Sequence, residues 1–373
     1  MRTIILVTYD ISPYRGSEAS VSWNYVSNMG EYHKVIVLYG RGKEEIEKYL
    51  ESHQIPNARF INIPYVSLQG SGLLLDIKYN LNYRRWHYQT YLKAKELVNN
   101  EHVDIIHYLN PIGFKEPGYC WKIKEVPYVW GPIQGVENRP LALFPALSSK
   151  GKINALVRRI VHNGMLWCLP RVRKALKRAD AVFAATPNTV KQLKCIHHKD
   201  AIYLPENGIL KMERTESITM NDTLNLIWVG SIDERKALGI LITALSKVKH
   251  NNWHLNVLGD GPLRGSCENL SNNLGISDRI TFHGKVDRTQ VQLVFGQSQV
   301  HVISSLGEAT TTVLWEAFSK AIPTITLDHC GMAGVVSSEC GIKIPIRSYQ
   351  QVLNDIAFDG TSGKSYKVKS RHH

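Results

Sequence analysis

The sequence predicts an α/β protein made of two Rossmann-like domains that face a cleft, and three features lead to this prediction. The chain has 373 residues, which suits two domains of roughly 100 to 200 residues better than one core. Short apolar runs alternate with longer amphipathic stretches, which is typical of βα units around a parallel sheet. A polar stretch divides this alternation into two series.

The first series contains six apolar runs of strand length. They lie at 3–10, 33–40, 59–66, 103–109, 126–131 and 181–186. The segments between them can hold helices or connecting loops. We therefore expect an N-terminal domain over residues 1–205, followed by a linker at 206–223.

The second series contains five apolar runs, and each is separated from the next by a segment long enough for a helix. They lie at 224–230, 254–261, 279–284, 300–305 and 322–328. This is again a doubly wound pattern, which predicts a second Rossmann-like domain over residues 224–346. After Phe358 the sequence becomes polar and has no helical periodicity, so we expect an atypical tail over residues 347–373 that is truncated or disordered.

Composition narrows the class of protein. The content of 43% hydrophobic and 21% charged residues is that of a soluble globular protein. The net charge of +13 favours anionic partners such as nucleotide phosphates, nucleic acid or a membrane surface. The six cysteines are scattered, so they predict neither a zinc site nor a disulfide framework. With no leader and no apolar run near the ~20 residues of a membrane span, we expect a cytoplasmic chain.

Residues 152–178 alternate apolar side chains with clusters of lysine and arginine. Such a segment can lie peripherally on an anionic membrane. It can equally be the solvated face of ordinary Rossmann helices, and the sequence leaves both interpretations open.

The strongest motif is the segment 304–320, in which a predicted strand leads through Gly307 into a predicted helix. Glu308 and Glu316 stand eight residues apart, which corresponds to roughly 12 Å along a helix. Two carboxylates at that spacing could hold the sugar and the ribose of one nucleotide-sugar, with the diphosphate at the helix N-terminus between them. The alternative is an ordinary acid at a helix start and a solvated acid further along.

This motif resembles that of the retaining glycosyltransferases of family four, which have the GT-B fold. The resemblance implies that Glu308 binds the donor sugar and Glu316 the ribose of the nucleotide. It also implies that Ala309 and Thr310 offer backbone or hydroxyl contacts, and that Gly307 lets the ligand approach the backbone.

Two further motifs of the second half resemble the same family. Arg235 and Lys236 follow a glycine-ended strand, and the resemblance places them against the diphosphate, where cations stabilise the leaving group. Ser231 stands where many members carry an arginine. Gly259 and Gly261 resemble the strand-end turn that makes room for the nucleotide.

The first half contributes weaker candidates. Gly16 is donor-binding and Glu18 acceptor-side in this interpretation, because both follow the first predicted strand. Gly135 and Glu137 lie in a loop that resembles the family's WGP loop, and we assign both to the acceptor side. His107 is predicted at a strand end facing donor or acceptor, although a single histidine there is often structural.

The resemblance implies transfer of a sugar from a UDP- or GDP-sugar to a glycan or lipid-linked acceptor, with retention of configuration, in bacterial capsule, lipopolysaccharide or other surface polysaccharide synthesis. We expect no cofactor and no metal, because the sequence has no Asp-x-Asp motif. Three alternatives stay open. They are a weakly active protein of this fold that lacks the closing C-terminal helix, a nucleotide-sugar epimerase, and a nucleic-acid-binding protein supported by charge alone.

Overall fold

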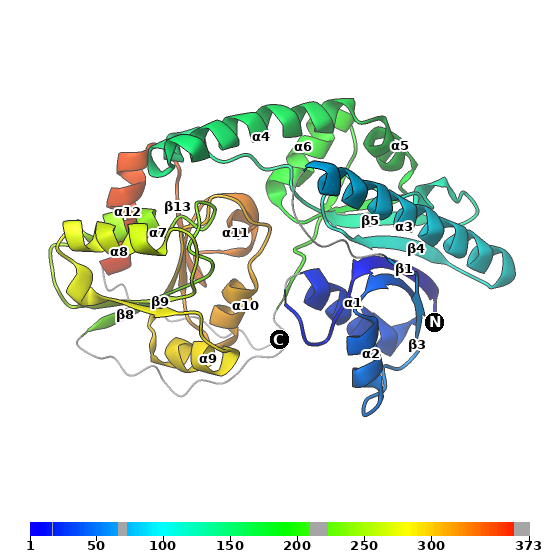
Figure 1. Cartoon of the computed structure of the whole chain (residues 1–373), viewed down its shortest axis with the longest axis horizontal. Helices are drawn as coiled ribbons and strands as arrows, with labels where there is room; N and C mark the ends of the chain where they lie inside the picture. Colours follow the sequence, from blue (N-terminus) through cyan, green and yellow to red (C-terminus); the bar gives the residue numbers. More distant parts are fainter. Residues whose placement is uncertain (17, 66–72, 209–222, 362–373) are drawn as a thin grey trace. The chain divides into compact units, whose positions relative to one another are not determined.

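The computed structural model describes residues 1–16, 18–65, 73–208 and 223–361. The chain forms two compact α/β units (Figure 1). The first comprises Met1–Val136 and His162–Glu206, and the second Glu137–Val161 and Asn207–His373. Each unit contains a parallel sheet with helices, which confirms the prediction of two Rossmann-like domains.

The first unit is built on a seven-stranded parallel sheet in the order β3-β2-β1-β4-β5-β6-β7. Its strands are β1 (Thr3–Asp10), β2 (Lys34–Arg41), β3 (Ala58–Asn62), β4 (Ile105–Asn110), β5 (Tyr128–Ile133), β6 (Ala181–Ala184) and β7 (Ile202–Tyr203). Because β1 lies between β2 and β4, the direction of winding reverses there, and that is the topological switch point of the sheet.

The helices of the first unit complete its core. They are α1 (Glu18–Tyr32), α2 (Lys43–Leu50), α3 (Leu73–Asn100), α5 (Pro170–Arg178) and α6 (Pro187–His197), with a 3-10 helix at Cys120–Lys122. Local sequence explains some of their limits: α6 starts after Thr186, whose hydroxyl accepts a hydrogen bond from the Thr189 N–H, and Pro187 takes the first helical position. Trp86, Trp130 and other large side chains fill the space beside the sheet.

The second unit is built on a six-stranded parallel sheet in the order β10-β9-β8-β11-β12-β13. Its strands are β8 (Leu224–Val229), β9 (Trp253–Leu258), β10 (Ile280–Gly284), β11 (Val300–Ile303), β12 (Thr324–Leu327) and β13 (Gly341–Ile344). The winding reverses between β8 and β11, so the switch point of this sheet lies at the ends of those two strands.

Its helices are α7 (Leu238–Leu245), α8 (Arg264–Asn273), α9 (Arg288–Gln297), α10 (Thr312–Ser319), α11 (Cys330–Val335) and α12 (Tyr349–Thr361), with 3-10 helices at Leu141–Ala146 and Ser277–Arg279. Helix α12 occupies the start of the range expected to be an atypical tail. Its Val352, Leu353 and Ile356 are buried in the core of the unit, because they repeat at the spacing of one helix face. Residues 362–373 lie outside the described part of the chain.

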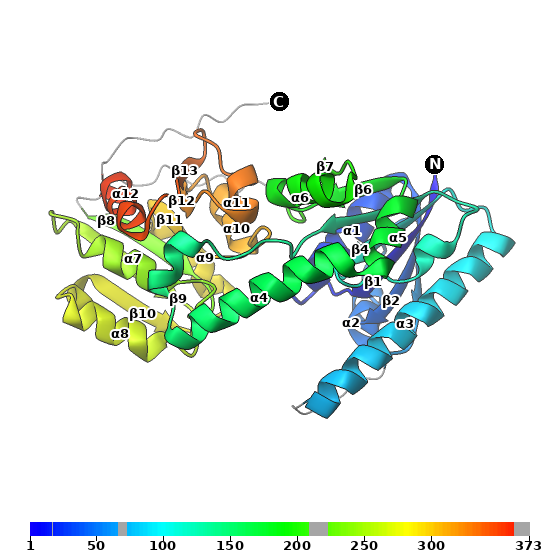
Figure 2. The same ribbon diagram turned by 90° about the horizontal axis from the view of Figure 1, so that it is seen from above.

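One segment joins a different unit from the one expected. Residues 137–161 were assigned to the first domain, but they belong to the second unit. Leu143, Leu147 and Ala155 are buried in its core cluster. The division between the units falls inside α4 (Ser149–Cys168), which Figure 2 shows as one continuous helix. Sequence order could not reveal this, since an apolar segment joins whichever core buries its side chains.

Candidate functional site

The predicted donor residues of the second unit gather at the switch point of its sheet. Arg235 and Lys236 follow β8, and Glu308 follows β11. These two strands are neighbours and parallel, so their carboxyl ends lie side by side. In open α/β sheets this is the position where ligands bind.

The three side chains form one charged cluster. The Lys236 ammonium lies 2.7 Å from the Glu308 carboxylate oxygen Oε1, and the Arg235 guanidinium donates a hydrogen bond to the same oxygen. Only 8% of the Glu308 side chain and 11% of the Lys236 side chain are exposed, whereas 43% of Arg235 is exposed. Two cations share this one carboxylate, and Arg235 has a second partner in the Asp233 carboxylate at 3.8 Å.

The backbone that carries the two cations is fixed by hydrogen bonds. The Asp233 carboxylate accepts from the N–H groups of Arg235 and Lys236, both at 2.9 Å. The Leu306 N–H donates to the Arg235 carbonyl at 2.8 Å, and the Ser304 hydroxyl donates to the Lys236 carbonyl at 2.8 Å. The loops after β8 and β11 are thus bonded to each other, which holds the charged groups in place before a ligand arrives.

Glycines bring these loops together. A Cβ on Gly230 would lie 3.1 Å from Cε of Lys236, so the lysine stem runs beside this glycine. At Gly259, which has a φ of +134°, a Cβ would lie 1.9 Å from the Gly230 carbonyl oxygen, and at Gly261 it would lie 2.5 Å from that of Ile232. Both glycines are needed for contact between loops, while their predicted contact with a nucleotide stays a prediction.

Gly259→Ala should therefore destabilise the second unit by about 1–3 kcal/mol, because the added methyl group overlaps the backbone and the φ value disfavours alanine. Urea unfolding followed by circular dichroism measures the change. Gly307→Ala is the matched control, since a Cβ there meets no atom within 4 Å. Equal urea midpoints for the wild type and Gly259→Ala would show that the two loops have room for the added methyl group.

The prediction that Glu308 opens a helix is wrong. Helix α10 begins at Thr312, after Thr311 in an extended conformation, and of the two acids only Glu316 is helical. Three consecutive β-branched threonines delay the helix, because their side chains lose rotamer freedom in it. The estimate of 12 Å along a helix therefore does not apply to this pair.

The irregular segment around Glu308 rests on the loop at the start of α11. The Gly331 N–H donates to the Glu308 carbonyl at 3.2 Å. A Cβ on Gly331 would lie 1.3 Å from the Ala309 carbonyl oxygen, so this approach requires glycine. Ala309 and Thr310 are both buried.

The remaining donor candidates of this unit are less constrained. Glu316 lies 3.7 Å from the guanidinium of Arg288, whose side chain is 82% exposed, so this ion pair contributes little to stability. Ser231 is exposed at the loop after β8, and Gly307 has open space beside it.

The sequence did not predict the contacts that hold the loop carrying Arg235 and Lys236. The Glu234 carboxylate, next to Arg235 in the chain, accepts a hydrogen bond from the Ser148 hydroxyl and lies 3.6 Å from the guanidinium of Arg139. The same hydroxyl caps α4 by accepting from the Gly151 N–H at 3.0 Å. The available signal was a serine just before a basic helix, which is typical of an N-cap.

Glu137 was predicted as an acceptor-side residue of the first domain, but it belongs to the second unit. The charge of its carboxylate influences the pKa values of His329 and Cys330, which lie beside the Glu308 segment. Burial lowers the pKa of His329, and the charge of Glu137 opposes that change. Burial raises the pKa of the Cys330 thiol, and the charge of Glu137 adds to it.

In the first unit, His107 is a buried residue inside β4. The prediction of a strand end is wrong, because β4 continues to Asn110. Its Nε2 donates a hydrogen bond to the Gly131 carbonyl at 2.7 Å. Burial lowers the pKa of His107, and the bond to Gly131 opposes that shift in part. The imidazole is therefore neutral near pH 7, with one N–H already used.

The loops after β1 and β5 hold the other candidates of this unit. Glu18 begins α1, and burial raises the pKa of its carboxyl, with a further rise from the charge of Asp10. A Cβ on Gly16 would meet no atom within 4 Å, so the space beside this glycine is open. Gly135 has a φ of +89°, and its carbonyl accepts from Nδ1 of His162 at 3.2 Å.

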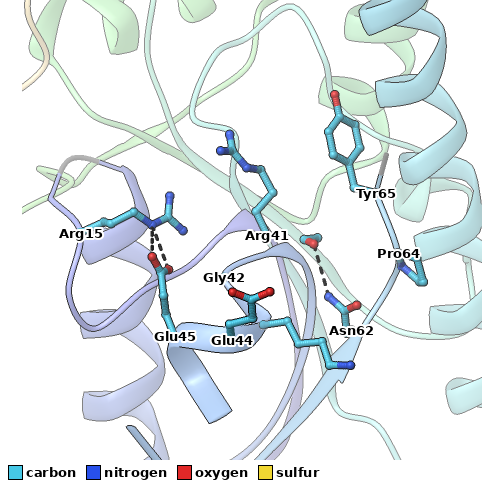
Figure 3. A pocket seen from close by; sticks show the side chains of 10 residues that line it. Arg15, Arg41, Gly42, Glu44, Glu45, Asn62, Pro64 and Tyr65 are labelled. Atoms are coloured by element: carbon cyan, nitrogen blue, oxygen red, sulfur yellow. Dashed lines mark hydrogen bonds and ion pairs between the residues drawn. The ribbon is translucent and has the colours of Figure 1, made fainter. Parts of the chain in front are cut away.

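A polar pocket of about 590 Å³ lies at the carboxyl ends of β2 and β3, and sequence reasoning missed it (Figure 3). It is lined by Arg15, Gly40, Arg41, Gly42, Lys43, Glu44, Glu45, Asn62, Pro64 and Tyr65. Arg15 is fixed by Asp10 at 2.6 Å and Glu45 at 2.9 Å. Figure 3 shows Arg41 and Tyr65 extending to the same side. The available signal was the basic glycine turn at 40–43 after a predicted strand.

The geometry at the ends of β8 and β11 agrees with a sequence comparison. Residues 213–358 match the family described as glycosyl transferases group 1. The lipopolysaccharide core biosynthesis glycosyltransferase LpsD of Rhizobium meliloti is 30% identical over 149 residues, which are 38% of this chain and 42% of the relative. The lipopolysaccharide 1,6-galactosyltransferase of Escherichia coli is 32% identical over 111 residues, 29% of this chain and 31% of the relative. The chain thus spans about half or less of the length of these relatives.

Solved structures share the whole fold. The lipopolysaccharide outer core galactosyltransferase WaaB, in its apo form, aligns with a TM-score of 0.63 at 14% identity over 95% of this chain and 89% of its own. HepE from Anabaena, solved in complex with UDP, aligns with a TM-score of 0.60 at 14% identity over 99% of this chain and 92% of its own. Both likenesses support the two-unit GT-B architecture.

Proposed function

We propose that this chain is a glycosyltransferase that takes a sugar from a nucleotide-sugar and passes it to a glycan or lipid-linked acceptor. The observation that carries the proposal is the cluster of Arg235, Lys236 and Glu308 at the switch point of the second sheet. The match of residues 213–358 to glycosyl transferases covers this cluster. No finding favours an epimerase or an inactive protein of this fold.

The cluster suits a diphosphate leaving group. Negative charge grows on the diphosphate as the bond from sugar to phosphate breaks, and Arg235 and Lys236 can stabilise it by charge-assisted hydrogen bonds. A diphosphate that takes up these cations competes with Glu308 for them. The Glu308 carboxylate is then available to accept hydrogen bonds from sugar hydroxyls, and in this proposal Glu316 binds the ribose.

We further propose transfer with retention of configuration, as in family four, without a protein nucleophile and without a cofactor. The donor is a UDP- or GDP-sugar, and the UDP complex of HepE supports the former. The lipopolysaccharide enzymes among the relatives support a role in bacterial surface polysaccharide synthesis. Among the described residues, no group of three or more histidine, cysteine or acidic side chains is placed to hold a metal ion.

The acceptor is placed at the first unit in this proposal. Its pocket offers the guanidinium of Arg41 as a partner for hydroxyl or anionic groups and the carboxylate of Glu44 as a partner for hydroxyl groups, and its volume is in the range of small-molecule sites. We expect Arg41→Ala to raise the KM for the acceptor, and steady-state kinetics with varied acceptor measures this change. A KM equal to that of the wild type would remove the pocket from the acceptor site.

Calorimetric titration of the full-length chain with UDP, GDP and ADP tests the proposed function. We expect one of them to bind with a Kd of about 1 μM to 1 mM, the range usual for enzyme substrates. The sugars of the tightest nucleotide then identify the donor. A chain that is folded by circular dichroism and binds none of the three would contradict the proposal.

A further inference from the structure

Ser304 carries a buried hydroxyl that links the core of the second unit to Lys236. It follows β11 directly, and 1% of the residue is exposed. Its Oγ accepts a hydrogen bond from the indole N–H of Trp228 at 3.1 Å, and its O–H donates to the Lys236 carbonyl at 2.8 Å. Trp228 is itself buried in β8. The hydroxyl thus connects a core side chain of one strand to the cation that follows it.

The two partners fix the direction of the Ser304 hydroxyl. An indole N–H can only donate and a carbonyl can only accept. The oxygen of Ser304 therefore accepts from Trp228, and its hydrogen points at the Lys236 carbonyl. All three residues are buried, and a buried polar group that loses its partner is costly. The hydroxyl is thus held in one orientation.

The same hydrogen bond closes a ring of contacts that includes Glu308. Ser304 and Glu308 lie in the same loop after β11. The Lys236 ammonium lies 2.7 Å from Oε1 of Glu308, and the Lys236 carbonyl accepts from Ser304. One loop therefore holds both the backbone and the side chain of this lysine. A shift of the carbonyl relative to Ser304 would move the ammonium relative to Glu308.

The lysine side chain has little freedom to compensate for such a shift. Only 11% of it is exposed, and its stem runs beside Gly230, where a Cβ would lie 3.1 Å from Cε of Lys236. Arg235 differs, because 43% of its side chain is exposed and its guanidinium can adjust. The position of the Lys236 ammonium therefore depends on the position of its backbone.

We propose that Ser304 is a positioning residue for the diphosphate of the donor and that it acts through Lys236. Its hydroxyl sets the place of the ammonium before the ligand arrives, so that a charge-assisted hydrogen bond to the diphosphate forms without rearrangement. The inference rests on the proposed function, in which Lys236 binds the diphosphate. It adds a residue that touches no ligand.

A double-mutant cycle tests the proposal. Ser304→Ala removes the hydroxyl, and Lys236→Met removes the ammonium while it keeps the stem. Calorimetric titration of the full-length chain measures the Kd of whichever of UDP, GDP and ADP binds tightest. We expect Ser304→Ala to weaken this binding about fivefold when Lys236 is present. In the Lys236→Met background it should weaken binding less than about twofold, because the ammonium that it positions is absent.

The loss of stability should follow a different pattern from the loss of affinity. The carbonyl at position 236 is present in both backgrounds, so Ser304→Ala should lower the urea midpoint equally in each. Ser298→Ala is the matched control. Ser298 is a fully buried serine of the same unit whose hydroxyl donates to the Val294 carbonyl at 2.7 Å, and its loss should leave the Kd unchanged. If Ser304→Ala is not folded by circular dichroism, Ser304→Cys, which keeps a weak donor, replaces it with a smaller effect in the same pattern.

The outcomes separate this inference from the proposed function. A wild-type Kd for Ser304→Ala would overturn the inference. Equal fold losses of affinity in both backgrounds would also overturn it, since the serine would then only stabilise the unit. A folded wild-type chain that binds none of the three nucleotides would contradict the proposed function and this inference with it. A wild type that binds, with a Ser304→Ala variant that binds equally well, would contradict the inference alone.

Discussion

Replacing Glu308 with glutamine should lower the turnover of sugar transfer by about a hundredfold or more. Glutamine keeps the shape of the side chain but removes the negative charge that Arg235 and Lys236 share. It also replaces one acceptor oxygen by an amide donor, so hydroxyls of the donor sugar lose a partner. The steady-state kcat with the donor found by titration measures the effect.

This variant should stay folded, so that its loss of turnover is not a loss of folded protein. A weakened hydrogen bond to a cation costs about 1–3 kcal/mol, which urea unfolding resolves. Glu339→Gln provides the same chemical change at an exposed acid of the second unit and should leave kcat unaltered. A Glu308→Gln variant with wild-type turnover would exclude the carboxylate from the reaction.

Replacing Lys236 with methionine should weaken the binding of nucleoside diphosphate by about tenfold to a hundredfold. Methionine keeps an unbranched stem beside Gly230, so the packing there is preserved while the ammonium is lost. The bound diphosphate then lacks the charge-assisted hydrogen bond that the Lys236 ammonium would donate to it. Calorimetric titration measures the Kd.

The comparison for this variant is Lys285→Met, which removes the charge of an exposed lysine in the same unit. It should bind the nucleotide like the wild type at moderate salt, because exposed charges are screened. If both variants bind equally well, Lys236 is not in the phosphate site. If both lose affinity equally, the effect comes from net charge alone and not from a specific contact.

The order of elements was predictable because it depends on local patterns. The runs at 3–10 and 300–305 anticipate β1 and β11, since strands of a parallel sheet covered on both faces are continuously apolar. The basic pair and the acid at 308 were also predictable as candidates, because they follow such strands and resemble a known motif. The structure then brings all three side chains to one point.

The features that the sequence predicted wrongly or not at all depend on contacts between distant residues or on competing local preferences. His107 was expected at a strand end, but the pairing of β4 with β1 and β5 continues to Asn110 and Tyr108 respectively. The helix expected at Glu308 starts later, because threonines resist the helical conformation and Thr311 is extended. The pocket beside Arg41 requires two strand ends and a loop to meet.

The sequence alone determined that this protein has two parallel sheets and that its candidate chemistry lies in loops after their strands, because the period of apolar residues and the positions of glycines are local properties. Only the tertiary structure decided that residues 137–161 join the second unit, and that Ser148 and Arg139 hold Glu234 beside the loop that carries Arg235 and Lys236. Each of these depends on which surface buries a side chain, and that choice is made by the free energy of the whole fold.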